Sequence, residues 1–240
     1  MSKTKTLALS PRAYIATLGM IGAVLIGAAI LFAPRYVAEA ASLYYTFNSP
    51  GTLYEADSVS GSSSSYLWLQ SGAKLIIQEG IGMTIQGALP STDPWFKTYV
   101  TRATVTSDGG THPQNAFVMY MKNSAQNVSA QIDVKRVKDN LTNLANRHPY
   151  NGESILVRYK DANNYYYGGI RADGNVVIKK KTNGVYHTLV MKKIFSGTYS
   201  AVSNPDLIPL NQWIGLKMVV VDGATGPMLS LYTDVGKTGT

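Results

Sequence analysis

The chain of 240 residues contains no cysteine, so disulfide bonds cannot contribute to its stability. Hydrophobic residues make up 45% of the chain, which is enough to build one sizeable core. A domain of this kind must therefore be held together by its core. All-β sandwiches of about 200–250 residues commonly form a single domain, and one domain is predicted here.

Histidine is scarce, and His112, His148 and His187 show no metal-ligand spacing. Loop or surface positions account for them better than a zinc site does. No cofactor is expected. A structural calcium ion is an open alternative, because loop carboxylates such as Asp206 and Asp222 are typical calcium ligands, although turns also favour aspartate. The chain has neither a phosphate-binding glycine loop nor a nucleophile elbow.

One long apolar run, residues 13–33, follows three basic residues and precedes Ala38-Glu39-Ala40, a small-residue cleavage pattern. The run exceeds the roughly 7–15 residues of a signal-peptide core and reaches the roughly 20 that span a bilayer. Residues 1–40 are therefore predicted to form an apolar helix, either a signal peptide cleaved after Ala40 or a membrane anchor. The domain itself, residues 41–240, is predicted to be secreted or anchored at the cell surface.

Charged residues make up only 15% of the chain, with basic residues in modest excess. The formal net charge is +8, and it falls to +5 without residues 1–40, which carry four cations and one carboxylate. This balance favours an anionic partner such as an acidic polysaccharide or a cell-wall polymer. A solvated surface with a few spare lysines explains it equally well. Nothing beyond the charge indicates a nucleic-acid partner.

Residues 153–189 contain runs of Val, Ile, Tyr and Thr that alternate with turn residues. Asp173-Gly174 and Asn183-Gly184 separate these runs, and such pairs supply the positive φ angles that tight hairpin turns require. The segment is therefore predicted to form four consecutive antiparallel strands.

Alternate residues of a strand point to opposite faces of the sheet, so one face of this meander must be buried. In the first strand Ile155, Val157 and Tyr159 share a side. In the second, Ile170 shares a side with Gly168 and lies opposite Gly169. If the isoleucine-bearing sides face the core, the other face gathers an aromatic and basic group: Arg158, Tyr165, Tyr167, Arg171, Lys179 and Lys181. The two glycines are expected to leave this face low and open.

Three phrases resemble the concanavalin A-like lectin and glucanase superfamily, which includes laminin-G-like modules. They are Arg158–Tyr166, Lys179–Tyr186 and the strand WIGLKMVVVDG that Trp213 opens. The resemblance covers Tyr45 to the C-terminus and implies an antiparallel jelly-roll β-sandwich that holds a glycan on its concave sheet face. Further strands normally follow in this superfamily, so the sequence is expected to be incomplete at its C-terminus, with an open edge prone to self-association.

The glucanases of this superfamily carry paired carboxylates on one strand, since two carboxylates must flank the glycosidic bond. This chain has only four glutamates, and its nearest pair, Glu55 with Asp57, lies in a loop where turn formation explains it. Lyase-like members instead use Arg, Gln, His and Tyr to offset uronate charge and move protons. The matching residues here are Gln131, Arg158, Tyr167 and Lys179, with His148 or His187 nearby.

The chain departs from the lyase pattern in two places. Arg102 stands alone where such lyases have an Arg-x-Glu-x-Arg strand. Asp133 follows Gln131-Ile132 where they typically carry histidine. Both departures weigh against lyase activity.

Further strands are predicted from β-branched and aromatic composition: two or three within Tyr66–Gly87, then Phe96–Thr106, Ala116–Lys122, Ser129–Val137, the Trp213 strand and Met228–Val235. Tyr99, Ala103 and Val105 look buried in the Phe96–Thr106 strand. In the Trp213 strand the buried set is Ile214, Leu216, Met218 and Val220, and Asp222-Gly223 is expected to turn the chain. The loops Lys138–Tyr150 and Phe195–Asn211 are expected to border a binding groove.

Three functions remain open. The first is an extracellular carbohydrate-binding module with a polysaccharide ligand, and its candidate site residues are Arg158, Tyr165, Tyr167, Arg171, Lys179 and Gln131. The second is a polysaccharide lyase acting on a uronate polymer, with Tyr167 or His187 moving the proton. The third is a structural or adhesive surface protein. The alternative for the tyrosines is that they merely cover the sheet.

Overall fold

The computed structural model describes residues 44–70, 74–85, 89–102, 118–122, 125–139, 141 and 147–237. Within this part the chain is mostly antiparallel β-sheet, which confirms the all-β class. The apolar helix predicted in residues 1–40 lies outside the described residues. Among the helices of the described part, none has the length and apolar character that crossing a bilayer demands.

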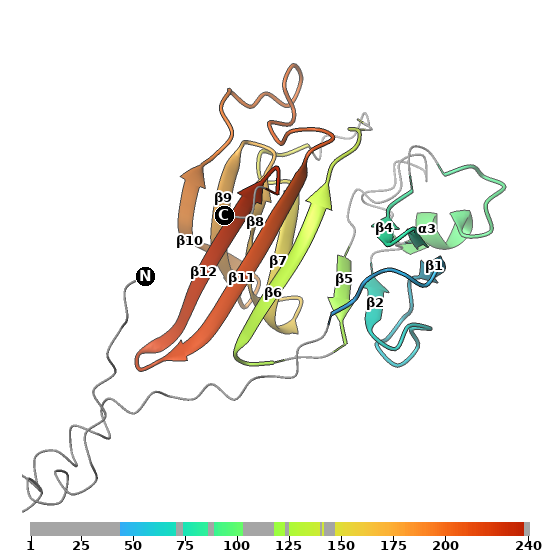
Figure 1. Cartoon of the computed structure of the whole chain (residues 1–240), viewed down its shortest axis with the longest axis horizontal. Coiled ribbons are helices and arrows are strands. Elements are labelled where there is room, and N and C mark those ends of the chain that lie inside the picture. The colour runs from blue at the N-terminus through green and yellow to red at the C-terminus, as the bar shows by residue number, and fades with distance from the viewer. Residues whose placement is uncertain are drawn as a thin grey trace, which may run out of the picture. The chain divides into compact units, whose positions relative to one another are not determined.

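Two antiparallel sheets form the larger part of the fold (Figure 1). The four-stranded sheet has the order β10-β9-β8-β7, and the three-stranded sheet has the order β12-β11-β6. Their strands are β6 (Val128–Lys135), β7 (Gly152–Asp161), β8 (Asn164–Arg171), β9 (Asn175–Thr182), β10 (Val185–Lys193), β11 (Trp213–Gly223) and β12 (Gly226–Val235). Figure 1 shows β6, β11 and β12 side by side in front of the four-stranded sheet.

The core lies between these two sheets. The predicted face of β11 is confirmed, because its four apolar side chains Ile214, Leu216, Met218 and Val220 are all at most 1% exposed. Met218 and Val220 pack with Val157 and Ile178 of the facing sheet. Burial of such side chains contributes about 1.5–3 kcal/mol each before the entropy of ordering is counted. The sandwich therefore depends on the alternation of apolar residues.

The predicted four-strand meander is confirmed as β7 to β10. Asn183 and Gly184 form the two-residue turn between β9 and β10, with φ angles of 48° and 83°. Two positive φ angles define the type I′ turn, whose twist matches that of the flanking strands. The turn pairs Val185 with Thr182 and so fixes the register of the whole hairpin. The turn between β11 and β12 lies at residues 224–225, two residues later than predicted.

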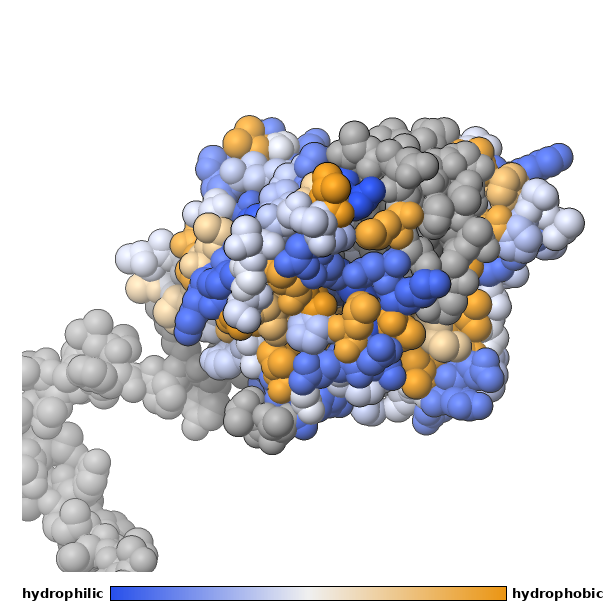
Figure 2. Space-filling view, turned by 90° about the horizontal axis from the view of Figure 1, so that it is seen from above, coloured by the Kyte–Doolittle hydropathy of each residue, from blue (hydrophilic) through white to orange (hydrophobic). Residues whose placement is uncertain are grey.

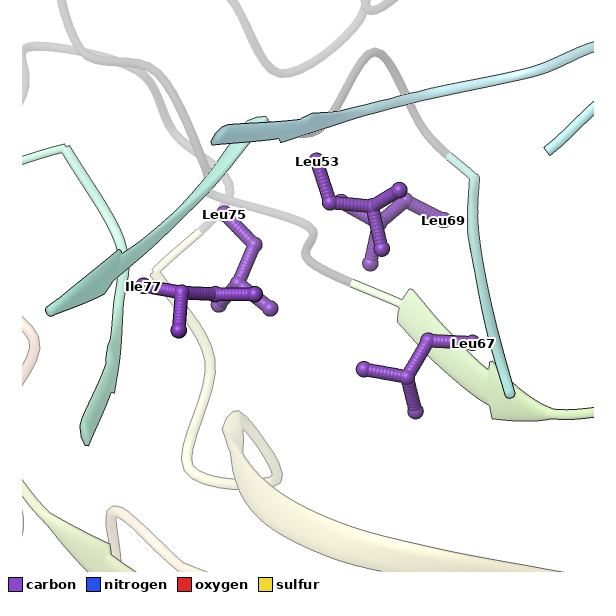
Figure 3. Packing of buried hydrophobic residues seen from close by; sticks show 5 residues of the cluster. All are labelled: Leu53, Leu67, Leu69, Leu75 and Ile77. Atoms are coloured by element: carbon purple, nitrogen blue, oxygen red, sulfur yellow. The ribbon is translucent and has the colours of Figure 1, made fainter. Parts of the chain in front are cut away.

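The other strands form two small sheets. One has the order β1-β3-β4 and the other pairs β2 with β5. Their bounds are β1 (Gly51–Tyr54), β2 (Leu67–Gln70), β3 (Lys74–Gln78), β4 (Ile81–Met83) and β5 (Val118–Met121). Leucine and isoleucine side chains from three of these strands converge in one apolar cluster (Figure 3): Leu53, Leu67, Leu69, Leu75 and Ile77.

The strand predicted at Phe96–Thr106 is wrong, because Phe96–Arg102 forms the helix α3. Phe96 and Val100 lie four residues apart, on one side of a helix, and pack with Leu89. Asp93 precedes the helix, and its Oδ1 accepts a hydrogen bond from the Trp95 N–H at 2.8 Å. This is N-capping, with a proline following the cap, and it outweighs the β propensity of the segment. Ala103 and Val105 lie outside the described residues.

Asp93→Ala is expected to lower the free energy of unfolding by about 1 kcal/mol at neutral pH, because the helix cap is lost. The hydrogen bond from Lys74, at 2.7 Å, holds the pKa of Asp93 below its ordinary range. A carboxyl whose pKa is lowered by folding stabilises above about pH 4 and loses that contribution as the pH falls. Urea unfolding should therefore show a difference between the two proteins that is full at pH 7 and shrinks at pH 3. A difference that grows at pH 3 would contradict this assignment.

In the described part of the chain, β10 is an edge strand, and all its residues are exposed. Five of them are apolar or aromatic: Val185, Tyr186, Leu189, Val190 and Met191. A register shift at Leu189 and the two lysines that end the strand are features that discourage edge-to-edge pairing. On the face seen in Figure 2, apolar side chains form separate patches among hydrophilic ones. Self-association through an open edge stays a prediction.

Candidate functional site

The outer face of the four-stranded sheet gathers tyrosines and lysines. Lys179 lies directly opposite Tyr167 on β8, and Lys181 lies opposite Tyr165. Tyr186 of β10 lies opposite Lys181 on its other side. Directly paired residues share a face, so these five side chains stand on the same side of the sheet. We call this set, Tyr165, Tyr167, Lys179, Lys181 and Tyr186, the tyrosine–lysine face.

The three tyrosine rings of this face touch one another. The centroids of the Tyr165 and Tyr167 rings are 6.2 Å apart, and Tyr186 meets the Tyr167 ring edge-on at 6.1 Å. The hydroxyl oxygens of Tyr165 and Tyr186 lie 3.0 Å apart, within hydrogen-bond distance. Tyr186 is 52% exposed, whereas the other two rings are half-buried. The rings therefore form a supported aromatic surface with one outward-facing member.

The two lysines lie over these rings. The Nζ atom of Lys181 is 4.8 Å from the centroid of the Tyr186 ring and 5.6 Å from that of Tyr165. The Nζ atom of Lys179 is 6.0 Å from the Tyr186 centroid. Lys181 also donates a hydrogen bond of 2.9 Å to the carbonyl oxygen of Ala162. Cation–π attraction and this bond hold the ammonium groups in defined positions.

The phenols of Tyr165 and Tyr167 stay protonated at neutral pH. Burial raises the pKa of Tyr165, and the hydrogen bond with Tyr186 raises it further. Burial is also the main cause of the raised pKa of Tyr167, while the cation of Arg171 opposes the shift. A protonated phenol offers both a hydrogen-bond donor and an acceptor. The face therefore offers neutral hydroxyls and positive ammonium groups.

Tyr186 was not among the residues predicted for this site. Its strand was predicted, but its face was not followed across the last hairpin. The signal was present, because the two-residue Asn183-Gly184 turn places Thr182 opposite Val185 and hence Lys181 opposite Tyr186.

The placement predicted for Arg158 and Tyr159 is wrong. The register between β7 and β8 shifts between Val157 and Asp161, and Arg158 has a φ of 49°. This irregularity interrupts the alternation along β7, and a left-handed φ is unusual for a residue other than glycine. Tyr159, predicted to face the core, instead stacks on Tyr165 with ring centroids 5.9 Å apart.

Arg158 turns away from the tyrosines and joins β7 to the other sheet. Its NH2 group lies 2.7 Å from Oδ1 of Asp222, at the end of β11. Its Nε atom donates to the carbonyl oxygen of Gln126 at 2.7 Å, and NH2 also reaches Asn127. The guanidinium is thus committed to a structural ion pair, and Arg158 is not part of the tyrosine–lysine face.

Tyr159 extends the aromatic surface toward the small sheets. Its ring lies 4.9 Å from that of Tyr120 on β5, and Tyr120 stacks on Trp68 of β2 at 4.9 Å. No local pattern indicates this continuation, because the three residues come from strands that are far apart in the chain.

The remaining predicted residues separate. Arg171 lies beyond Tyr167 on β8, but its NH2 group pairs with Asp173 at 2.7 Å. Gln131 is exposed on β6, opposite Lys217, and its neighbours Ala130 and Ile132 pack into the core. Gln131 therefore stands on the outer face of the other sheet, away from the tyrosine–lysine face.

The residues proposed for proton transfer are also divided. His187 lies opposite Lys180, which pairs with Tyr166, so it stands on the face opposite Tyr167. His148 stacks on Tyr150 in a loop, with centroids 4.7 Å apart. Among the residues of the lyase hypothesis, Tyr167 and Lys179 alone are brought together on this face.

The two aspartates considered as calcium ligands lie in ion pairs. Asp222 pairs with Arg158, and Asp206 pairs with Arg136. Within the described ranges, no three His, Asp or Glu side chains converge in a way that could hold a metal ion.

The two loops predicted to border a groove meet near the Arg171 end of the sheet. Arg147 donates a hydrogen bond of 3.0 Å to the carbonyl oxygen of Ala201. Arg171 reaches the carbonyl oxygen of Pro149 at 3.4 Å. The first contact ties residues 147–150 to the loop that follows β10, and the second ties them to the end of β8.

The sequence suggested that the two glycines of β8 leave the sheet face low and open, but in the structure they do not. Gly168 faces the core, where an added Cβ would lie 2.4 Å from the sulfur of Met218. Gly169 lies against the backbone of β7, and its Cβ would lie 2.2 Å from the carbonyl oxygen of Glu153. Both glycines therefore serve close packing.

Comparisons with models of protein families, with curated proteins and with solved structures find no match. The geometry therefore defines the class: an antiparallel, all-β domain whose two larger sheets pack face to face and whose outer sheet face carries tyrosines and lysines. The resemblance to the concanavalin A-like superfamily stays a prediction.

Proposed function

We propose that this domain is an extracellular carbohydrate-binding module that holds a polysaccharide on the tyrosine–lysine face. We also propose that its two larger sheets belong to a jelly-roll sandwich of the concanavalin A-like kind. The clustering of Tyr165, Tyr167 and Tyr186 on one sheet face carries the proposal of function. The apolar run and cleavage pattern within residues 1–40 support export.

Tyrosine suits this role because it combines an apolar ring with a polar tip. The ring can cover the C–H face of a sugar, while the phenolic hydroxyl exchanges hydrogen bonds with sugar hydroxyls. The rings of Tyr165 and Tyr167 are already supported by their neighbours, so little side-chain entropy is lost when a ligand arrives.

The ligand is proposed to be a chain of several sugars rather than a single one. Ring contacts continue from Tyr186 through Tyr165 to Tyr159, with centroid separations of 6.5 and 5.9 Å. A surface with several successive aromatic contacts rewards a ligand that spans them all. Affinity is therefore expected to rise with oligosaccharide length.

Tyr186→Ala combined with Tyr167→Ala is expected to weaken polysaccharide binding by at least about tenfold, since two ring contacts are removed. The measurement is affinity electrophoresis against a panel of xylan, mannan, β-glucan, alginate and polygalacturonate. Several polymers are needed because the proposal names polysaccharides as a class and does not specify one sugar.

Tyr232→Ala is the matched control. Tyr232 is an exposed tyrosine, 57% accessible, on β12 of the other sheet. Circular dichroism must show that all variants keep the native β-sheet signal. If Tyr232→Ala weakens binding as much as the paired variant does, the ligand lies elsewhere. If the unsubstituted protein retains no polymer of the panel, the proposed function is wrong.

A further inference from the structure

The hairpin of β9 and β10 concentrates positive charge. From Asn175 to Lys193 the chain contains five lysines and no carboxylate: Lys179, Lys180, Lys181, Lys192 and Lys193. Register divides them between the two faces of the sheet: Lys179 and Lys181 stand beside the tyrosines, Lys193 stands on the same face at the other end of the hairpin, and Lys180 and Lys192 stand on the opposite face. The positive charge near the tyrosines therefore comes from Lys179 and Lys181 on this face, and not simply from the net charge of the domain.

The arginines near this surface are neutralised by the protein itself. Arg171 pairs with Asp173, and Arg158 pairs with Asp222, each at 2.7 Å. By contrast, in the described part of the chain neither Lys179 nor Lys181 lies within ion-pair distance of a carboxylate. The tyrosine–lysine face thus carries two cations that the described residues leave unbalanced.

These two cations are also held in place. Lys181 is fixed by the Ala162 carbonyl and by two rings, and Lys179 lies over Tyr186. Two positive charges at fixed positions beside sugar-stacking rings would attract an anion that is part of the sugar chain. A neutral sugar would stack on the rings but would give the two ammonium groups no anionic partner.

We propose that the ligand is an acidic polysaccharide and that Lys179 and Lys181, not the arginines, select its charge. This inference rests on the proposed function, because it assigns the ligand class of the same face. Carboxylated and sulfated sugars share the relevant chemistry, since a lysine ammonium attracts both as a point charge.

The test compares polymers that share a backbone and differ in the charge of their substituents. Polygalacturonate and its methyl ester share one backbone, and dextran sulfate and dextran share another. Both charged polymers are expected to bind at least about tenfold more tightly than their neutral counterparts at low salt. The preference should fall as salt is raised to about 0.5 M, where exposed charges are strongly screened. The ratio between the two charged polymers distinguishes a carboxylate preference from a sulfate preference.

The variant Lys179→Gln with Lys181→Gln should lose most of this preference. The control is Lys180→Gln with Lys192→Gln, which removes the same charge from the same hairpin but from the opposite face. If both pairs weaken binding equally, only the net charge of the domain matters, and the assignment to Lys179 and Lys181 is overturned.

Two other outcomes reject the inference in different ways. Equal binding of charged and neutral polymers would leave the carbohydrate-binding function intact but remove its charge selectivity. An oligothymidylate that binds more tightly than polygalacturonate would show that the rings stack bases, as in single-strand binding proteins. Retention of no polymer at all would instead be a failure of the proposed function.

Discussion

Arg136→Met is expected to lower the free energy of unfolding by about 3 kcal/mol, because it removes one partner from a largely buried ion-pair cluster. The NH2 group of Arg136 lies 2.6 Å from Oε1 of Glu153, and NH1 contacts Oδ2 of Asp206. Asp206 is only 6% exposed in its side chain, so its charge would be left without compensation. Urea denaturation followed by tryptophan fluorescence measures the change.

Two further variants test the cause. Asp206→Asn in the Arg136→Met background should recover part of the loss, because the uncompensated buried charge is then removed. Lys237→Met breaks a more exposed ion pair, in which Lys237 is 47% accessible and lies 2.5 Å from Asp133, and should lower the free energy of unfolding by clearly less than Arg136→Met does. Equal losses for Arg136→Met and Lys237→Met would show that burial of the cluster contributes nothing.

The cluster matters to the fold because it joins three segments. Arg136 follows β6, Glu153 is the second residue of β7 and Asp206 belongs to the loop that follows β10. The carbonyl oxygen of Arg136 also accepts a hydrogen bond from Asn211. This loop inserts Ile208 into the core beside Ile214, so the ion pairs and the apolar contact act on the same loop.

Local patterns were sufficient to predict the meander and the face of β11. A period of two residues marks a strand with one buried side, and Asn183-Gly184 supplies two positive φ angles. Tyr165, Tyr167, Lys179 and Lys181 were placed correctly on one face for the same reason. These features depend on neighbours in the sequence, which is why composition and alternation were enough.

Non-local features were missed. The irregularity at Arg158 has no glycine to mark it, and its positive φ goes together with contacts to Asp222, 64 residues away in the chain. Alternation counted along β7 therefore failed from Arg158 onward. The helix α3 was missed for a different reason: the segment was predicted from its β-branched and aromatic composition alone, whereas the local feature that starts the helix is the cap, Asp93 followed by proline.

The second large effect is expected at Gly169. Gly169→Ala should lower the free energy of unfolding by about 3 kcal/mol, at the upper end of the usual cost of overpacking. The new methyl group would lie 2.2 Å from the carbonyl oxygen of Glu153 and 2.6 Å from Cβ of Ser154. Backbone atoms of a paired strand cannot move aside as a side chain can, so β7 and β8 would have to separate.

Gly168→Ala and Gly51→Ala provide the comparison. At Gly168 the methyl group meets the sulfur of Met218, which can change rotamer, and we expect a smaller loss of about 1–2 kcal/mol. At Gly51 nothing lies within 4 Å, and the change should be within about 0.5 kcal/mol. Urea unfolding of the three variants under one condition ranks their losses of stability. Any other order would show that the close approach of β7 and β8 does not limit stability.

Gly169→Ala should also weaken polysaccharide binding. Tyr167 lies two residues before Gly169 on β8, so a separation of β7 and β8 would disturb the tyrosine–lysine face, whereas Gly51→Ala should leave binding unchanged.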